Sequence, residues 1–339
     1  MKRILTVPLS GLYAFGVGLR HMLYDEHVFR TTEVNIPTIC VGNIAVGGTG
    51  KTPHVEYLIN LLSKQYKVAV LSRGYKRATK GFVMADAQST AQSIGDEAMQ
   101  LYLKFPDVCV AVCENRIRGI HQIQAMRPDV DVVILDDAFQ HRALKCGYNI
   151  VLTRYDRLYA DDHMLPWGSL RDLKKRILKA NAVVVTHCPE QMQPIEKRVV
   201  GNHLHLPPYI RLYFSKFRYG TPYRTGRPLV VAGIANPQYL MDYVNRHYQG
   251  AEIMAFGDHH AFTPAELKQI EQRAKDFDFI ITTEKDFVRL QATDLYNRMA
   301  ERIEAIAIEM DLDEDAADFD KQVLNYVHEN HLKCRSHNS

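Results

Sequence analysis

The sequence lacks the strong charge of one sign that marks many nucleic-acid-binding proteins. Its 339 residues contain 42 Lys and Arg and 39 Asp and Glu, so the formal net charge is only +3. An arginine-rich tract, a zinc-spaced set of Cys and His and an RNA-binding signature are all missing, and we therefore expect no nucleic-acid partner. The six cysteines are scattered, and most lie in or beside apolar runs, as reduced core cysteines do. A reducing, cytoplasmic compartment fits this pattern.

Long hydrophobic runs are also missing. The nearest approach is the uncharged segment of sixteen residues between Arg3 and Arg20, which is a little short for a bilayer span and is weakened as a helix by Pro8 and three glycines. Its leucines fall near one helical face, and basic residues flank it. Two alternatives stay open for residues 1–30. They form either a buried first helix of the domain or a membrane-interface helix whose basic ends meet anionic lipid, and we favour the second.

A glycine-rich segment starting at Val41, VGNIAVGGTGKTPHVEYL, is the most informative feature that is present. It matches the phosphate-binding loop pattern G-x-x-x-x-G-K-[ST], with Ala45 in the first glycine position. Glycines let successive backbone N–H groups form an anion-binding nest, and the helix that follows favours negative charge at its N-terminus. A glycine-rich turn without a phosphate role is the alternative. The residues expected to bind nucleotide phosphates are Gly47, Gly48, Thr49, Gly50, Lys51 and Thr52.

Continuous apolar runs separated by helical patterns follow the loop. Runs of this length are typical of parallel strands that are covered on both faces by helices. The sequence therefore predicts an α/β fold with a mostly parallel sheet. The candidate strands after the loop are residues 67–72, 107–112, 131–136, 148–153 and 181–186.

Two domains with a cleft between them are expected from the length and from a change of pattern near residues 205–225. There, paired prolines, alternating aromatics and turn residues suggest a connector, and we expect it to form a two-stranded ribbon. A second set of apolar runs and helical patterns follows. The predicted division is 1–30 for the N-terminal helix, 31–205 for the phosphate-loop domain, 206–227 for the linker ribbon and 228–339 for a smaller C-terminal α/β domain.

Two adjacent carboxylates, Asp136 and Asp137, come at the end of an apolar run. Magnesium prefers oxygen ligands, and a carboxylate that a strand delivers beside a phosphate loop can hold it, directly or through water, with the Thr52 hydroxyl. An acidic strand-end turn is the alternative. Gln140 and His141 follow at once, in a turn at the carboxyl end of the sheet, where ligands collect in open α/β folds.

Other polar residues stand at helix starts or in strand-end loops. Asp96, beside Glu97, heads a helical pattern, where an acid is often only a cap. Arg116 follows a strand and is placed either to reach a γ-phosphate or to pair with a surface acid. His259 and His260 are adjacent, so their side chains point in different directions and we expect at most one to be functional. Further candidates are Arg73 and Tyr75 in a strand-end loop and Arg171 and Asp172 in an irregular segment.

An ordered set of motifs adds to these separate signals. From the N-terminal apolar segment to about residue 286, the chain contains in order VGNIAVGGTGKTP, SRGYKR, GDEAMQL, DDAFQHR, LPWGSLRD, GIANPQYL, FGDHHAFT and TTEKD. In this combination the sequence resembles the tetraacyldisaccharide 4′-kinases, the lipid A 4′-kinases of Gram-negative bacteria.

The resemblance implies two α/β/α domains, the first a P-loop NTPase-like domain with a mostly parallel sheet, joined by a two-stranded linker. It implies an enzyme that uses ATP and Mg²⁺ and transfers the γ-phosphate to the 4′-hydroxyl of a tetraacyl glucosamine-disaccharide 1-phosphate, in lipid A (lipopolysaccharide) biosynthesis. Its partners would be the lipid disaccharide and an anionic membrane surface, met through the N-terminal helix. We expect a monomer, peripheral or monotopic, at the cytoplasmic face of the bacterial inner membrane.

Roles of individual residues follow from the resemblance by motif position. Lys51, Thr52 and Arg116 would bind the ATP phosphates, with Thr52 also on magnesium. Asp96 would be the catalytic base, assisted by the histidine of the DH motif, which falls on His259. The metal and its water would be held by Asp136 and Asp137, and the remaining site residues would be Arg73, Tyr75, Gln140, His141, Arg171 and Asp172. The chain departs from the usual family pattern at Lys76 and Ala138, where glycine is common, and at Asp172, which replaces a glutamate.

The main rival from another class is a P-loop ATPase switch, or a metallochaperone-like protein, whose nucleotide controls partner binding. Loops of that class usually carry a lysine just before the two glycines, where this chain has Val46. A GTPase switch would need an N-K-x-D motif, and in TEKD the residues Lys285 and Asp286 are adjacent instead. A membrane scaffold with an inactive nucleotide fold is a third class, against which the intact Lys51 and Asp96 argue.

Overall fold

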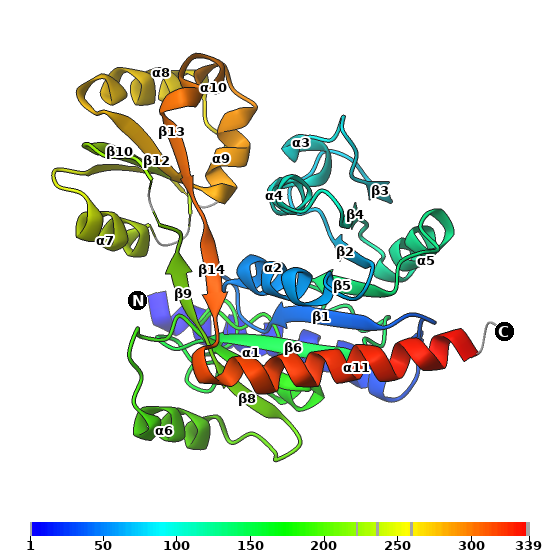
Figure 1. Ribbon diagram of the computed structural model, residues 1–339. Coiled ribbons are helices and arrows are strands. Elements are labelled where there is room, and N and C mark those ends of the chain that lie inside the picture. Colours follow the sequence, from blue (N-terminus) through cyan, green and yellow to red (C-terminus); the bar gives the residue numbers. More distant parts are fainter. Residues whose placement is uncertain (1, 222, 235–236, 258–259, 337–339) are drawn as a thin grey trace.

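The computed structural model describes residues 2–221, 223–234, 237–257 and 260–336. Its larger domain is built on an eight-stranded sheet with the strand order β3-β4-β2-β5-β1-β6-β7-β8 (Figure 1). Neighbouring strands are parallel except at one edge, where β3 is antiparallel to β4. The strands are β1 (Thr38–Asn43), β2 (Val68–Ser72), β3 (Val83–Met84), β4 (Cys109–Val112), β5 (Val132–Asp136), β6 (Tyr148–Arg154), β7 (Ala182–Thr186) and β8 (Arg211–Phe214).

The five strand segments predicted after the loop are confirmed as β2, β4, β5, β6 and β7. Their residues are almost continuously buried because helices cover both faces of the sheet. One face packs against α5, α6 and the short 3₁₀ helix η1, and the other against α2, α4 and α11. The helices of this domain include α2 (Lys51–Leu62), α3 (Ala91–Ile94), α4 (Asp96–Lys104), α5 (Arg116–Met126), η1 (Lys174–Lys179), α6 (Pro194–Leu204) and α11 (Ala316–Ser336).

The smaller domain has a parallel sheet of four strands in the order β11-β10-β12-β13. Helix α7 packs on one face, and α8, α9 and α10 pack on the other, so this domain is also α/β/α. The elements are β10 (Pro228–Ala232), α7 (Gln238–His247), β11 (Glu252–Ala255), α8 (Pro264–Arg273), β12 (Phe279–Thr283), α9 (Glu284–Gln291), α10 (Asp294–Met299) and β13 (Ile303–Ile306).

Two antiparallel strands connect the domains, as expected. Strand β9 (Lys216–Tyr219) leaves the larger domain, and β14 (Ile308–Asp311) returns to it (Figure 1). The predicted linker segment 206–227 therefore supplies only one strand of the ribbon. Its first part contains β8, which pairs with β7 and belongs to the large sheet.

The last helix, α11, corrects the predicted division of the chain. Residues 228–339 were expected to form one domain, but α11 packs against the large sheet, on the same face as α2 (Figure 1). Phe319, Val323 and Val327 recur at intervals of four residues, so they form one apolar stripe, and all three are buried in the core of the larger domain. The larger domain is thus made from both ends of the chain.

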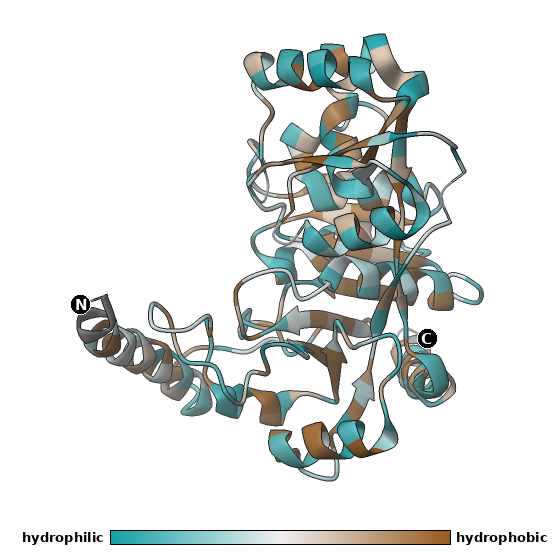
Figure 2. Ribbon diagram, turned by 90° about the vertical axis from the view of Figure 1, so that its left-hand side faces the viewer, coloured by the Kyte–Doolittle hydropathy of each residue, from teal (hydrophilic) through white to brown (hydrophobic). Residues whose placement is uncertain are grey.

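The first helix, α1 (Lys2–Asp25), lies along the larger domain and extends beyond it at its N-terminal end (Figure 2). One flank is packed, since Ser10 and His21 are buried. The other flank carries a row of exposed apolar side chains, so the alternative of a buried first helix is wrong. Among the helices that the structure describes, none has both the length and the apolar character needed to cross a bilayer. The exposed row is Val7, Leu9, Leu12, Phe15, Leu19 and Met22.

The packing of α11 gives a testable prediction about stability. Phe319 is 1% exposed, and replacing such a side chain with alanine should lower the free energy of unfolding by about 3–5 kcal/mol. The matched control is Leu332→Ala on the same helix, where the side chain is 56% exposed. Urea unfolding followed by the fluorescence of the single tryptophan, Trp167 in the larger domain, measures both. Equal effects of the two substitutions would contradict the docking of α11.

Candidate functional site

A cavity of about 1520 Å³ lies between the two domains, so the expected cleft is present. On the side of the larger domain it is lined by the glycine-rich loop, by the loop after β2 and by residues that follow β5. On the other side it is lined by the linker strand β9 and by α7. Because β1, β2 and β5 are parallel, their carboxyl ends meet at this edge of the sheet, which is where ligands bind in open α/β folds.

The glycine-rich loop runs from the end of β1 into α2, and all six of its predicted phosphate-binding residues line the cavity. Gly47 and Gly50 have φ angles of 108° and 81°, which residues with a side chain rarely adopt. Gly50 directly precedes the first turn of α2, so the loop ends at a helix N-terminus that favours an anion. The loop is fixed by Asn43, whose Nδ2 donates a 2.7 Å hydrogen bond to Thr49 Oγ1.

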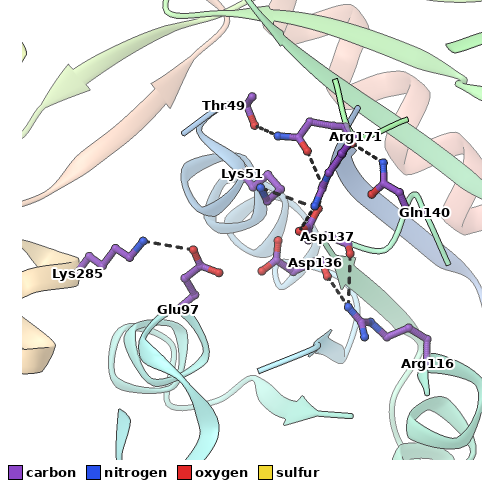
Figure 3. A network of polar contacts seen from close by, with 10 residues as sticks. Thr49, Lys51, Glu97, Arg116, Asp136, Asp137, Gln140, Arg171 and Lys285 are labelled. Carbon is purple, nitrogen blue, oxygen red and sulfur yellow. Dashed lines mark hydrogen bonds and ion pairs between the residues drawn. The ribbon is translucent and has the colours of Figure 1, made fainter. Parts of the chain in front are cut away.

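The two adjacent carboxylates have opposite electrostatic environments (Figure 3). Burial would raise the pKa of Asp137, but Lys51, 3.9 Å away, and the guanidinium of Arg171, which binds both carboxylate oxygens, outweigh it and lower that pKa. Burial, reinforced by Glu97, instead raises the pKa of Asp136 to about 7. Asp136 Oδ1 accepts no hydrogen bond from any described residue. A buried carboxylate oxygen without a donor is suited to a cation.

The expected magnesium ion can be tested against this donor set. Within the described ranges, no group of three or more His, Cys, Asp and Glu side chains could hold a metal by itself. Magnesium usually keeps several waters and binds through one or two carboxylates together with substrate phosphates. Asp136 and the Thr52 hydroxyl, both on the cavity wall, fit that kind of site.

Arg116, at the start of α5, is buried next to the backbone of the two carboxylate residues. Its guanidinium donates to the backbone oxygens of Cys113, at 2.9 Å, and Asp136, at 3.3 Å. Its Nε has no hydrogen-bond partner among the residues that are described. Since the side chain is buried and lines the cavity, the structure favours the phosphate alternative over pairing with a surface acid.

A hydrogen-bond network links the loop to the remaining predicted residues. Arg171 Nη2 donates to Asn43 Oδ1 at 2.6 Å, and Gln140 Nε2 donates to the Asn43 backbone oxygen at 2.7 Å (Figure 3). His141 lines the cavity beside them. Burial, together with Arg116, lowers the pKa of His141 to about 4, so this imidazole is neutral. Arg73 and Tyr75, in the loop after β2, also line the cavity.

Asp172 is the site residue that the structure places elsewhere. It was expected to contact substrate, but its side chain is buried outside the cavity and lies 2.5 Å from His21 Nε2 of α1. Arg171 lines the cavity, whereas the side chain of the next residue, Asp172, faces α1. Its role is to attach α1 to the segment that carries Arg171.

The predicted base, Asp96, is the first residue of α4. It lies just beside the large cavity, in a small pocket shared with the loop after β2, and Oδ2 accepts hydrogen bonds from Arg289 of the smaller domain. Its expected partner, His259, lies outside the described residues. The neighbouring His260 has its Nε2 2.9 Å from Glu266 Oε2, at the start of α8, and its ring stacks on Phe256.

Sequence reasoning missed Arg20 and Asn43 as site residues. Arg20 reaches the cavity from α1 and donates a 3.1 Å hydrogen bond to the Gln140 backbone oxygen. No local pattern could have revealed this, because the contact depends on how α1 docks. Asn43 was visible as the last residue of β1, directly before the loop, and that position was the available signal.

His54 joins the loop to the linker. Its Nδ1 lies 2.7 Å from the Gly50 backbone oxygen, and its Nε2 lies 3.1 Å from Ser215 Oγ, just before β9. Burial lowers the pKa of His54 to about 4. The imidazole is therefore neutral, and Nδ1 must carry the proton because its partner is a carbonyl oxygen.

Comparisons with known proteins agree with one another. The sequence model of the family described as tetraacyldisaccharide-1-P 4′-kinase matches residues 2–328. A tetraacyldisaccharide 4′-kinase of Bacteroides fragilis is 43% identical over 95% of this chain and 93% of its own length. One of Flavobacterium johnsoniae is 40% identical over 97% and 98%. A crystal structure described as the "apo" form of LpxK from Aquifex aeolicus in complex with ATP has a TM-score of 0.75 and 26% identity, over 96% of this chain and all of that one.

The neutral His54 predicts an acid-sensitive fold. Its pKa falls from 6.5 in the unfolded chain to about 4 in the folded protein. Below pH 6.5 the unfolded state therefore binds a proton that the folded state does not bind. The stability is fully present above pH 6.5 and is lost as the pH falls toward 4. When the pH is lowered from about 7.5 to about 5, protonation of His54 in the unfolded chain should lower the free energy of unfolding by about 2 kcal/mol.

Urea unfolding of the wild type and of His54→Gln at the two pH values measures this cost. Glutamine cannot be protonated but can donate to the Gly50 oxygen. The loss on acidification should therefore be smaller in the variant, and the difference between the two proteins cancels the contributions of other histidines. An equal loss in both would show that His54 is not the group responsible.

Proposed function

The chain belongs to the tetraacyldisaccharide-1-P 4′-kinase family, and from this premise we propose how the residues of its cavity perform the reaction. It is an ATP-dependent kinase that transfers the γ-phosphate to the 4′-hydroxyl of the acylated disaccharide 1-phosphate, a step of lipid A biosynthesis. The rival function of an ATPase switch or metallochaperone is set aside, since the relatives are named as kinases.

The observation that carries the site assignment is that three features meet in a single cavity: the loop, a buried guanidinium, and a carboxylate oxygen, Asp136 Oδ1, with no donor among the described residues. We assign the backbone of Gly47–Thr52 and the Lys51 ammonium to the β- and γ-phosphates. Arg116 is assigned to the γ-phosphate, where its uncommitted Nε supports binding of a further anion. Fixed donors of this kind stabilise the charge that spreads over the transferred group.

Thr52 and Asp136 are assigned to Mg²⁺, with Asp137 beside them. When bound, the ion would neutralise part of the negative charge of the phosphates. Asp137 is already engaged by Lys51 and Arg171, and it therefore orients those two cations as well.

Asp96 is assigned as the base. A sugar hydroxyl is a weak nucleophile near neutral pH and needs a proton acceptor within hydrogen-bond reach. The oxygen of the sugar hydroxyl attacks the γ-phosphorus, and the bond from that phosphorus to the β–γ bridging oxygen breaks. The hydroxyl proton passes to the Asp96 carboxylate. His259 keeps its proposed role as the assisting histidine. We propose that the enzyme acts as a monomer.

The acceptor side is assigned to the wall next to α1. Gln140 and Arg171, which α1 contacts, line the cavity there together with His141, and Arg20 enters it from α1 itself. Arg73 and Tyr75 line the same cavity from the loop after β2. The exposed apolar row of α1 leads away from this wall. We propose that the row rests in the cytoplasmic leaflet of the inner membrane, so that the acyl chains stay in lipid while the sugar enters the cavity.

Asp96→Asn tests the base. The wild type incubated with ATP and the acyl disaccharide 1-phosphate should form the 4′-phosphorylated product, and the variant should lose turnover by about 100-fold or more. ATP affinity should stay close to wild type, because the carboxylate does not contact the phosphate loop. The control is Asp107→Asn, an exposed acid outside the cavity. Near-normal turnover of Asp96→Asn would remove the base from this residue.

The membrane contact is best tested by substitution, because deleting α1 would also leave the buried Asp172 without His21. Leu12 and Phe15 are each 68% exposed, and the double change Leu12→Ser, Phe15→Ser should weaken binding to anionic vesicles by about 3 kcal/mol, at least about 100-fold. Flotation with vesicles measures this. Met126→Ser, at an exposed position on α5, is the control. Unchanged flotation of the double variant would exclude this face as the anchor.

A further inference from the structure

Helices α4 and α9 face each other across the two domains, and charged side chains connect them. Arg289 pairs with Asp96 at 2.6 Å, Lys285 with Glu97 at 3.5 Å, and Lys104 with Glu284 at 2.8 Å. One of these contacts differs from the other two, because its acidic partner is the residue assigned as the base. Figure 3 shows the neighbouring pair, in which Lys285 reaches from the smaller domain toward Glu97.

Arg289 is held rigidly by its own domain. Its side chain is only 7% exposed, and Nη1 donates to Asp286 Oδ1 at 2.6 Å and to the Gly233 backbone oxygen at 3.2 Å. Asp286 is itself fully buried and accepts hydrogen bonds from the Gly233 amide and the Thr283 hydroxyl. The guanidinium plane is therefore oriented by the smaller domain, independently of its contact with the larger one.

The contact with Asp96 is directional. Nε and Nη2 of Arg289 both donate to the same oxygen, Oδ2, at 2.8 Å and 2.6 Å. Two donors on one oxygen fix the rotation of the carboxyl group. Charge-assisted hydrogen bonds of this length are stronger than neutral ones, so the orientation is well defined.

We propose that Arg289 is a positioning residue for the phosphoryl transfer: it turns the Asp96 carboxylate toward the acceptor hydroxyl, and it does so only when the two domains are together. This inference rests on the proposed role of Asp96 as the base. The hydroxyl proton still goes to Asp96, while Arg289 keeps its own protons and remains a cation throughout. Separation of the domains removes both hydrogen bonds, so the base is oriented only when the two domains are in contact.

Arg289→Met and Arg289→Lys test the proposal against a simple role in holding the domains together. A carboxylate that is misplaced by about 1 Å costs about 100-fold in rate, so Arg289→Met should lose about that much kcat with little change in the KM for ATP. Lysine keeps the charge but not the two parallel donors, and should recover only part of the loss. Added guanidinium ion, at concentrations that do not unfold the protein, should restore activity to Arg289→Met.

The matched control is Lys104→Gln. It breaks another ion pair between the same two helices but does not touch Asp96. Its kcat should stay near wild type and should not respond to guanidinium. If Arg289→Met raises the KM for ATP and leaves kcat unchanged, or if Lys104→Gln reproduces its loss of kcat, Arg289 only holds the domains together and the proposal is wrong.

A double-mutant cycle separates this proposal from the assignment of the base. If Asp96→Asn is inactive and adding Arg289→Met causes no further loss of its residual rate, the two residues act as one unit, as proposed. Additive losses would overturn the positioning role alone. Normal turnover by Asp96→Asn would overturn the base, and the positioning role with it. Should Arg289→Met fail to fold, the kcat of Arg289→Lys and the thermal unfolding of both variants still decide the question.

Discussion

The close approach between the phosphate loop and the linker is the constraint on which the site depends. A Cβ atom added to Gly50 would lie 2.2 Å from Cζ of Phe217 on β9, so only glycine fits beside that ring. His54 strengthens the same joint by connecting the Gly50 oxygen to Ser215. The loop to which we assign phosphate binding thus touches the strand that leads to the other domain. In that assignment, nucleotide binding and domain arrangement share one set of contacts.

Around this joint, opposite charges are arranged in advance of any ligand. Lys51 and Arg171 hold Asp137 ionised, whereas burial and Glu97 favour a proton on Asp136 in the free protein. Neighbouring titratable groups whose pKa values are shifted in opposite directions are typical of functional sites that bind or transfer charged groups. Arg116 contributes a further buried cation whose partners in the free protein include backbone carbonyls. A polyphosphate with its metal would provide partners for these cations and for Asp136 Oδ1, which has no donor among the described residues.

Local pattern was enough for much of this architecture, and long-range contact explains the rest. The strands after the loop could be predicted because both faces of the sheet are covered, which makes each strand a continuous apolar run. The loop could be predicted because its glycines are required by its backbone. Asp172 could not be assigned correctly, since its partner His21 is 151 positions away. The packing site of Phe319 could not be predicted either. The apolar stripe on α11 is apparent in the sequence, but the sheet against which it packs is formed by a distant part of the chain.

The same long-range contacts decide which domain is free to move. Helix α1 is attached to the larger domain through the buried pair of His21 and Asp172, and α11 is buried in that domain's core. The smaller domain is attached by the ribbon of β9 and β14 and by the ion pairs of α4 with α9. Ion pairs that are partly exposed are weaker than a buried core, and relative domain motion is the normal expectation for such an interface. In the proposed arrangement, with α1 resting on lipid, the acceptor wall and the phosphate loop would stay fixed together at the membrane. The smaller domain, which brings Arg289 to Asp96, can then open and close above them without detaching the protein from its substrate.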